Sequence, residues 1–474
     1  MTVLTMMIAL PLVGLAFDVG ILYMIRGKLY QAVDAAALAG ARALGSGPDS
    51  PTQRANARTA ATKYFNANYP SGFWGTISVN FPTPTVDDTT VPNYRTVTTT
   101  ASIVAPLYFL RMLGQNTAVV AASSQAGRRD ALVMLVLDRS SSMTAAFQGS
   151  TACAIMKTDA AQFVSNFSQG RDMVGLVIFG SSAFTFPPTT SFATPNAQGN
   201  TVASLINQIS CGGNTNMVEG VHQAYAQIQA VNATTRANVI VLMTDGRPNG
   251  FTGDYTLLKK GACKNNAPSP NPLRGVYAQW AGGPVSSGTT AGLMLWQAPN
   301  AAYNSDAVTP DAASSHCAML ADLTTGNQDL TKMPTTDIYN NSTTGPYSAN
   351  NPNAPYNNTT VDVTKITIPQ WVEVAGANAV DNQGTTIRTN ATLKPAIYTI
   401  ALEGNSPGDP PDTLLLRKLA NDPSMENDPD STTRTMWAGQ TSQTKGFFVD
   451  APDPGELCAA FNQIATQIVV RLSK

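Results

Sequence analysis

Four apolar runs in the chain have the pattern of strands that are buried on both faces. They are ALVMLVLD (131–138), GLVIFG (175–180), ANVIVLMTDG (237–246) and PAIYTIAL (395–402). Helical patterns lie between and after them, over residues 154–167, 202–209, 217–231, 414–420 and 454–472. Because strands that alternate with helices form right-handed crossovers, we expect an α/β fold with a doubly wound, Rossmann-like sheet.

The N-terminal segment 1–25, MTVLTMMIALPLVGLAFDVGILYMI, is apolar except for Asp18 and is long enough to cross a bilayer. The helical pattern continues through RGKLYQAVDAAALAGARAL, where Ala and Gly suit close contact between helices. We expect one long hydrophobic helix over residues 1–45, in a membrane at its start and protruding at its end. An acid inside a membrane is a functional candidate by default, although one near a helix end can simply reach the interface.

A different pattern covers residues 46–129. PTQRANARTAATKYFNANYP predicts a helix that has Pro51 in its first turn and ends at Pro70. The stretches GTISVNF, YRTVTTTASIVA and NTAVVAASSQAG alternate and are rich in Val, Thr and Ile, which predicts strands. PLYFLRMLG, before the last of them, predicts a short helix. Together these elements predict a small α+β module that is pilin-like.

The length of the chain favours more than one domain. We expect a helical domain over 1–45, the small module over 46–129, and the α/β domain over 130–474 with a large insertion at 250–391. The insertion is dense in Asn, Thr, Pro, Ser and Gly, a composition that permits disorder. Its tryptophans, its two cysteines and its helical patterns at 273–280, 312–323 and 372–381 favour a partly folded excursion that contributes to partner choice. A solvated spacer is the alternative.

Charge and cysteine content narrow the classes of partner and site. The net charge is -1 and 12% of residues are charged, so nucleic acid is excluded as a partner, because it needs a dense basic face. The cysteines contain no C-x-x-C pair, which argues against zinc and redox dithiols. Outside the cytoplasm we expect two disulfides and one thiol, with Cys153–Cys211 and Cys263–Cys317 as the suggested pairs.

Acids and hydroxyls follow two of the apolar runs. Asp138, Ser140 and Ser142 stand at alternate positions from the end of one run, and Asp245 ends the apolar part of another. Ligands in doubly wound sheets bind beyond the carboxyl ends of the strands. With Thr215 in CGGNTNMVEG, these residues resemble the metal-ion-dependent adhesion site (MIDAS) of von Willebrand factor A (vWA) domains, and RDMVGLVIFGSSAF resembles the second strand of that family.

The vWA resemblance implies that Ser140, Ser142 and Thr215 bind a cation directly, while Asp138 and Asp245 hold its waters. All five side chains offer hard oxygen donors, which suit Mg²⁺ best, with Mn²⁺ or Ca²⁺ possible. An open coordination position would then accept an exposed carboxylate of a protein ligand. The alternative is that the two aspartates only cap helices or polar turns.

Residues 1–43 resemble the N-terminal region of TadE/TadG-like proteins of Flp-type pilus assembly systems. The most specific part is DAAALAGARA, which begins at Asp34, and the family also has an acid inside its apolar helix, where Asp18 lies here. Such proteins usually begin with a short basic leader, whereas this sequence begins directly at the apolar run. We therefore expect either that a leader was omitted or that the chain is the mature form left by a prepilin-type peptidase. An ordinary single-span membrane anchor is the alternative.

Catalysis is not expected. The chain has no G-x-x-x-x-G-K-[ST] loop, Ser140 replaces the second acid of a D-x-D nucleophile pattern, and the histidines are His222 and His316 alone. We expect an adhesion or protein-binding protein of the cell envelope, anchored in the inner membrane or displayed on the cell surface or a pilus. Its partners would be pilus or envelope assembly components. The alternative is a minor, tip or main structural subunit of an extracellular filament or homo-oligomer.

Overall fold

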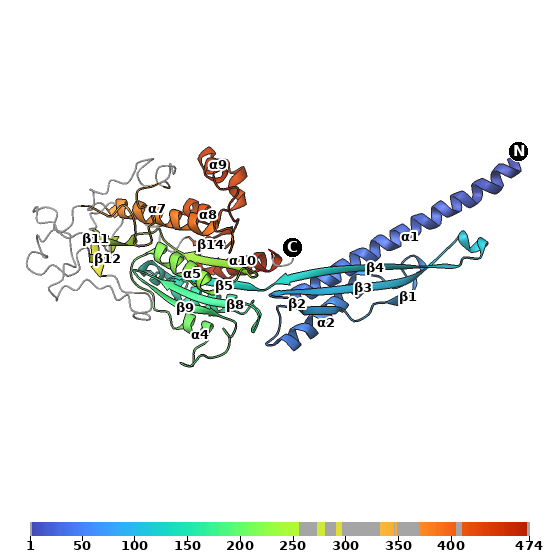
Figure 1. Cartoon of the computed structure of the whole chain (residues 1–474), viewed down its shortest axis with the longest axis horizontal. Coiled ribbons are helices and arrows are strands. Elements are labelled where there is room, and N and C mark those ends of the chain that lie inside the picture. The colour runs from blue at the N-terminus through green and yellow to red at the C-terminus, as the bar shows by residue number, and fades with distance from the viewer. Residues whose placement is uncertain are drawn as a thin grey trace, which may run out of the picture. The chain divides into compact units, whose positions relative to one another are not determined.

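The computed structural model describes residues 2–255, 273–279, 291–295, 332–345, 347, 369–403 and 410–471. The chain divides into two compact units, which are described separately (Figure 1). Unit 1 contains Met1–Asp130, Asn166–Arg171 and Ile468–Lys474, and unit 2 contains Ala131–Ser165 and Asp172–Gln467. The helix expected over 1–45 and the module expected over 46–129 therefore lie in one unit.

Unit 1 combines two long helices with a small antiparallel sheet. Its elements are α1 (Thr2–Ala43), α2 (Ser50–Asn68), η1 (Phe73–Gly75), β1 (Ile77–Asn80), β2 (Thr85–Val91), β3 (Tyr94–Pro106), η2 (Leu110–Leu113) and β4 (Thr117–Arg129). Strand β3 pairs with β4 along its whole length and with β1 and β2. The ribbon of β3 and β4 runs along α1 (Figure 1). The pattern analysis located these helices and strands except η1 and β2.

One stripe of α1 forms the core of unit 1. Ile21, Ile25, Leu29 and Val33 follow one another at intervals of four residues, so they share one face of the helix. They pack in one cluster with Phe65 of α2 and with residues of β3 and β4. Within the part of the chain that the structure describes, no helix has the length and apolar character needed to span a membrane. The side chains before Val13 lie outside that part, so the membrane span over 1–25 stays a prediction.

Asp18 fastens η2 and the turn before it to α1. Its buried carboxylate accepts hydrogen bonds from the backbone N–H groups of Tyr108 at 2.8 Å, Phe109 at 3.0 Å and Leu110 at 2.7 Å. These groups lie at the start of the short helix η2, where N–H groups need acceptors. Asp34 lies exposed on the same helix. Asp18 therefore has a local structural role that its position in an apolar run did not indicate.

Replacing Asp18 by Asn should lower the stability of unit 1 by about 1–3 kcal/mol, because a neutral amide oxygen accepts weaker hydrogen bonds than a carboxylate. Amide hydrogen exchange at residues 108–110 of the full chain should become faster. The control is Asp34→Asn on the same helix, which should leave exchange at these amides unchanged. Unchanged protection in the Asp18 variant would refute the role assigned to this carboxylate.

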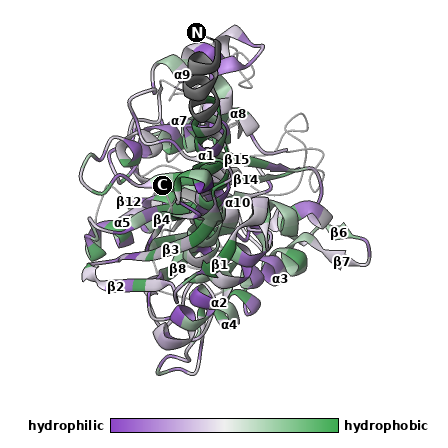
Figure 2. Cartoon of the chain, turned by 90° about the vertical axis from the view of Figure 1, so that its right-hand side faces the viewer, coloured by the Kyte–Doolittle hydropathy of each residue, from purple (hydrophilic) through white to green (hydrophobic). Residues whose placement is uncertain are grey.

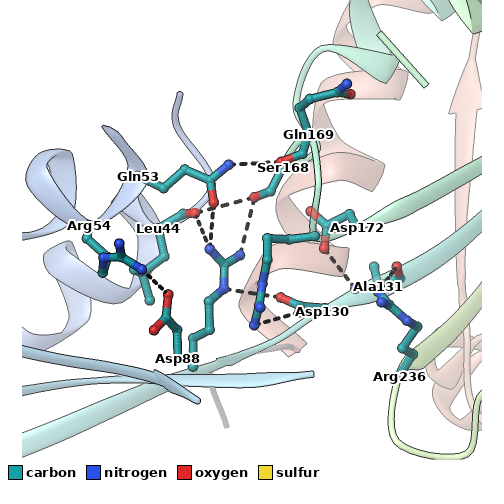
Figure 3. A network of polar contacts seen from close by, with 12 residues as sticks. Leu44, Gln53, Arg54, Asp88, Asp130, Ala131, Ser168, Gln169, Asp172 and Arg236 are labelled. Carbon is teal, nitrogen blue, oxygen red and sulfur yellow. Dashed lines mark hydrogen bonds and ion pairs between the residues drawn. The ribbon is translucent and has the colours of Figure 1, made fainter. Parts of the chain in front are cut away.

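A buried arginine organises a second polar cluster of unit 1 (Figure 3). Arg95 of β3 is 1% exposed, and its Nε lies 3.1 Å from Asp130 Oδ1. Its Nη1 donates to the backbone oxygen of Leu44 and to the side-chain oxygen of Gln53, both at 2.8 Å. A buried guanidinium is stable only when its charge and its donors are matched in this way.

The short segment Asn166–Arg171 also belongs to unit 1, although its neighbours in sequence lie in unit 2. Ser168 contacts Arg95, with 3.4 Å between Oγ and Nη2, and the backbone oxygen of Gln169 accepts a hydrogen bond from Gln53 at 3.1 Å (Figure 3). The segment thus completes the polar cluster around the arginine.

Unit 2 is a mixed α/β domain built on a six-stranded sheet with the order β15-β14-β10-β5-β8-β9. The strands are β5 (Ala131–Asp138), β8 (Met173–Phe179), β9 (Ala183–Thr189), β10 (Ala237–Thr244), β14 (Ala396–Leu402) and β15 (Phe447–Ala451). All neighbours pair in parallel except β8 and β9. The helices are α3 (Ala152–Val164), α4 (Val202–Asn207), α5 (Met217–Val231), α7 (Pro369–Arg388), α8 (Thr413–Ala420), α9 (Ser431–Ala438) and α10 (Leu457–Arg471).

The position of β5 in the centre of the sheet explains why its sequence is apolar. Leu132, Met134 and Val136 join a core cluster with α5, α7 and α8. The residues between them point to the opposite face of the sheet and are also fully buried. Both faces are therefore covered. Strands β14 and β15 likewise carry the hydrophobic colour in Figure 2.

The predicted insertion contains part of the core. Its helical pattern at 372–381 lies in α7, whose residues pack in the central cluster. The helix predicted at 273–280 is wrong: residues 273–279 form strand β12, which pairs with β11 (Gly250–Tyr255) and β13 (Ala291–Leu295). A short apolar stretch does not by itself distinguish a helix from a strand. The helix predicted at 312–323 lies outside the described residues.

Candidate functional site

The ends of two neighbouring strands bring the candidate residues together. Strands β5 and β10 are parallel and in register, with Met243 opposite Leu137. Asp138 is the last residue of β5, and Asp245 directly follows β10. The chain then turns from Asp138 into the short helix η3 (Ser141–Thr144). The turn therefore places its serines at the same edge of the sheet as both aspartates.

The two serine hydroxyls bond to Asp245, whereas Asp138 is bonded to Thr244, a threonine that was not among the predicted ligands. Ser142 Oγ donates to Asp245 Oδ1 at 2.7 Å and lies 2.9 Å from Ser140 Oγ. Ser140 Oγ is 3.5 Å from the same carboxylate oxygen. Asp138 accepts the backbone N–H of Ser140 at 2.7 Å through Oδ1 and the hydroxyl of Thr244 at 2.6 Å through Oδ2. Four of the five predicted ligands thus form one hydrogen-bonded cluster.

Thr215 is held by its backbone. Its N–H donates to the side-chain oxygen of Asn249 at 2.6 Å, and its carbonyl accepts the N–H of Asn249 at 3.0 Å. Within the described residues, its hydroxyl forms no hydrogen bond with the other four predicted ligands. Sequence reasoning missed Thr244 and Asn249. Their position near Asp245, in the stretch TDGRPN, is the sequence feature that could have indicated them.

A disulfide fixes the loop that carries Thr215. Cys211 lies in this loop and is bonded to Cys153 in the first turn of α3. The pair is one of the two suggested from sequence. Cys263 and Cys317 lie outside the described residues, and among the described cysteines Cys458 is free.

The electrostatics of the site favour a cation. Asp138 and Asp245 are fully buried. Burial and then the negative charge of Asp245 raise the pKa of Asp138 to about 7. Two buried like charges are costly without a counter-charge. A divalent cation would supply that charge, and the carboxylate and hydroxyl oxygens present are the donors that Mg²⁺ prefers.

No softer metal site competes in the described part of the chain. There, no group of three or more His, Cys, Asp or Glu side chains is arranged so that it could hold a metal ion. His222 stacks on Tyr339 with ring centroids 3.5 Å apart, and its Nδ1 lies 3.0 Å from Gln383. His316 lies outside the described residues. The candidate site depends instead on hydroxyls with two carboxylates.

A piece of the predicted insertion packs close to the Thr215 loop. Asn216, next to Thr215, donates to Thr252 at 2.9 Å, and the Thr252 hydroxyl donates to Glu219 at 2.9 Å. Tyr339 donates to the other oxygen of Glu219 at 2.6 Å. Burial raises the pKa of Glu219. A hydrogen-bonded chain therefore links the loop of the candidate site to the segment 332–345.

Comparison with known sequences identifies one domain. Residues 133–247 match the family model of the von Willebrand factor type A domain. This range contains all five candidate ligands, so the chain contains a vWA domain. No curated protein sequence matches the chain. The TadE/TadG-like character of residues 1–43 stays a prediction.

The solved structures that the chain resembles include proteins of bacterial pili. A mutant of the PilB minor pilin from Streptococcus sanguinis is 14% identical with a TM-score of 0.36, over 84% of this chain and 79% of that chain. The vWF domain of the type V pili tip protein Mfa5 from Porphyromonas gingivalis is 14% identical with a TM-score of 0.34, over 73% and 97%. The pilus adhesin SpaC from Lactobacillus rhamnosus GG, in its open conformation, is 12% identical with a TM-score of 0.33, over 86% and 36%. Likeness at this level carries no argument about function.

Proposed function

We propose that this protein is a pilus-associated or cell-surface adhesion protein whose vWA domain binds an acidic group of a partner protein through a divalent cation. The observation that carries the proposal is the cluster at the ends of β5 and β10. There, the hydroxyls of Ser140 and Ser142 meet the carboxylate of Asp245, inside the range that matches a vWA domain.

The donor set determines what a bound cation would do. Ser140, Ser142 and Thr215 would hold Mg²⁺ through neutral oxygens, and Asp138 and Asp245 would hold its waters. Hydroxyls do not neutralise the ion, so it would keep enough positive charge to attract a carboxylate of the partner. Within the protein, Asp245 would orient the serine hydroxyls, and Asp138 would hold the backbone of Ser140 and the hydroxyl of Thr244.

The disulfide supports a location outside the cytoplasm. Structural disulfides persist in oxidising compartments and are rare in the cytoplasm of ordinary bacteria. The Cys153–Cys211 bond fixes the loop of the candidate site. An envelope or surface location therefore agrees with the chemistry of the site as well as with a role in adhesion.

A structural role in a filament or a membrane anchor is the second candidate, and the surface of α1 favours it. Several large apolar side chains on this helix are exposed, among them Val13 at 68%, Phe17 at 51%, Val19 at 55% and Tyr23 at 77%. Exposed apolar surface of this kind usually marks a contact with another molecule or a bilayer. Recovery of the protein as a repeating component of sheared surface fibres would favour the filament subunit, and recovery as a detergent-extracted monomer would count against it.

Calorimetric titration of Mg²⁺, Mn²⁺ and Ca²⁺ into the metal-free full chain tests the proposed function. Saturable binding of at least one ion, removed by chelator, is the expected result. Failure of all three ions to bind a chain shown to be folded by circular dichroism would overturn the metal-dependent mechanism. If an ion does bind, that ion should also be required for adhesion of the protein to its partner surface.

Mg²⁺ affinity should fall as the pH is lowered through about 7, because a proton on Asp138 competes with the cation. The fall should approach about tenfold per pH unit below that value if one proton is released on binding. In the metal-free chain, the raised pKa acts on stability with the opposite sign. Unit 2 should lose stability as the pH rises from 3.8 towards 7, since the folded state binds the proton more tightly in that range. Calorimetry and thermal unfolding over a pH series measure both effects, and a flat affinity profile would contradict the assignment.

A further inference from the structure

A pocket of about 510 Å³ lies among α7, α8 and α9, and shares no residue with the candidate metal site. Its size falls within the roughly 300–1,000 Å³ of small-molecule sites. Most of the residues that line it carry hydroxyl, amide or charged side chains: Asp381, Asn382, Thr385, Lys418, Ser431, Thr432, Thr435, Gln440 and Gln443, together with Met436 and Gly439.

The two charged side chains that line the pocket form an ion pair. Lys418 Nζ lies 2.7 Å from Asp381 Oδ2, and the two residues are 8% and 1% exposed. The ammonium also lies 5.4 Å from the centre of the Tyr347 ring, which holds it from another side. A ligand with a net charge would therefore meet a repelling partner as well as an attracting one. The pocket suits a neutral molecule.

One buried acceptor in this pocket is unused. Asp381 Oδ1 is buried and has no hydrogen-bond partner among the described residues, whereas Oδ2 is bonded to Lys418. A buried carboxylate oxygen without a donor costs free energy, so such an atom usually has a partner in the working protein. A hydroxyl or N–H group of a bound molecule would supply such a donor.

A buried arginine beneath the pocket holds part of the lining in place. Arg388 is 1% exposed, and its Nη2 donates to Gln440 Oε1 at 2.7 Å and lies 3.3 Å from the Thr385 hydroxyl. Its Nε donates to Gln443 Oε1 at 2.9 Å. This bond fixes the orientation of the Gln443 amide. Side chains fixed in this way make a preorganised site.

The remaining lining offers hydroxyls, which both donate and accept hydrogen bonds. Ser431, Thr432 and Thr435 all come from α9, whereas Asp381 belongs to α7 and Lys418 to α8. A pocket whose two charged lining groups form an ion pair, and which also offers a carboxylate acceptor, amide donors and hydroxyls, matches a molecule that carries many hydroxyl groups on a compact carbon frame. We propose that the pocket among α7, α8 and α9 binds a neutral sugar, with one sugar hydroxyl donating to Asp381 Oδ1.

Saturation-transfer NMR on the full chain with glucose, galactose, mannose and N-acetylglucosamine tests the proposal. At least one of these sugars should receive saturation from the protein and show a saturable affinity. Thr435 is exposed and lines the pocket, so the bulky side chain of the variant Thr435→Trp should fill part of it and weaken that affinity by more than about tenfold. Thr435→Ser should keep it.

Thr466→Trp is the matched control. Thr435 and Thr466 are both exposed on helices, and each hydroxyl bonds to the carbonyl four residues earlier at 2.9 Å. The two Trp variants therefore carry the same change in the same local structure, and only one lies at the pocket. No binding of any of the four sugars by the wild type, or equal binding by both Trp variants, would overturn the proposal. Asp138→Ala, which removes a residue of the candidate metal site, should leave sugar binding intact. Loss of metal binding and loss of sugar binding can therefore be distinguished.

Discussion

Replacing Asp245 by Asn should weaken Mg²⁺ binding by roughly 10- to 100-fold, the size of effect expected when a carboxylate that orients the ligands of a metal is lost. Asp245 accepts the hydroxyls of Ser142 and Ser140, so it sets the direction of both oxygens that would bind the ion. It also supplies one of the two negative charges that a cation would neutralise. Asparagine keeps the shape of the side chain and removes that charge.

The metal-free Asp245→Asn variant should be at least as stable as the wild type at neutral pH. The negative charge of Asp245 is one cause of the raised pKa of Asp138, and removing it relieves repulsion between two buried carboxylates. Weakened metal binding together with unimpaired folding separates a metal site from a purely structural acid. Calorimetry gives the affinity and thermal unfolding gives the stability.

Asp159→Asn, on α3, provides the control for Asp245→Asn. It removes an acid of unit 2 that belongs to neither the metal cluster nor the sugar pocket, and should leave Mg²⁺ affinity unchanged. If the Asp245 variant binds Mg²⁺ as tightly as the wild type, the cluster at the ends of β5 and β10 is not the metal site. The two aspartates would then serve only to cap their turns.

Removing the disulfide in a Cys153→Ser/Cys211→Ser variant should lower the free energy of unfolding of unit 2 by about 4 kcal/mol, the loss that chain entropy predicts for a closed loop of this length. The two cysteines are 58 residues apart in sequence. The disulfide therefore restricts a long stretch of the unfolded chain, which includes α3, β8 and β9. Urea unfolding followed by circular dichroism measures the loss.

The disulfide variant should also bind Mg²⁺ more weakly, because the Cys211 loop carries Thr215. Cys458→Ser is the control, since this cysteine is free and lies outside that loop. It should leave both stability and affinity unchanged. An unfolding midpoint of the double variant equal to that of the wild type would show that packing alone holds the loop.

The candidate site was largely predictable from sequence, because it depends on a rule of sheet topology. The carboxyl ends of parallel strands meet at one edge, so Asp138 and Asp245 had to approach each other once β5 and β10 were recognised as buried strands. The spacing of the motif did not reveal which neighbouring residues hold Asp138 and Thr215 in place. Thr244 and Asn249 act through single hydrogen bonds whose geometry depends on the folded loops.

Other features depended on tertiary structure from the start. The stretch at 273–279 has the composition of either element and becomes a strand because β11 and β13 flank it. Helix α7 follows a low-complexity region in sequence but packs in the core of unit 2. The pocket proposed for a sugar combines residues of three successive helices, and no sequence pattern marks any of these residues individually.

The segment Asn166–Arg171 has a consequence for how this architecture can be recombined. In sequence, it lies between two elements of the vWA domain, yet Ser168 and Gln169 bond to residues that precede Asp130. A vWA domain excised at Asp130 would leave behind the residues that contact this loop. A vWA domain joined to a different N-terminal module would therefore need either a redesigned loop at 166–171 or an arginine and an amide in the new module to replace Arg95 and Gln53.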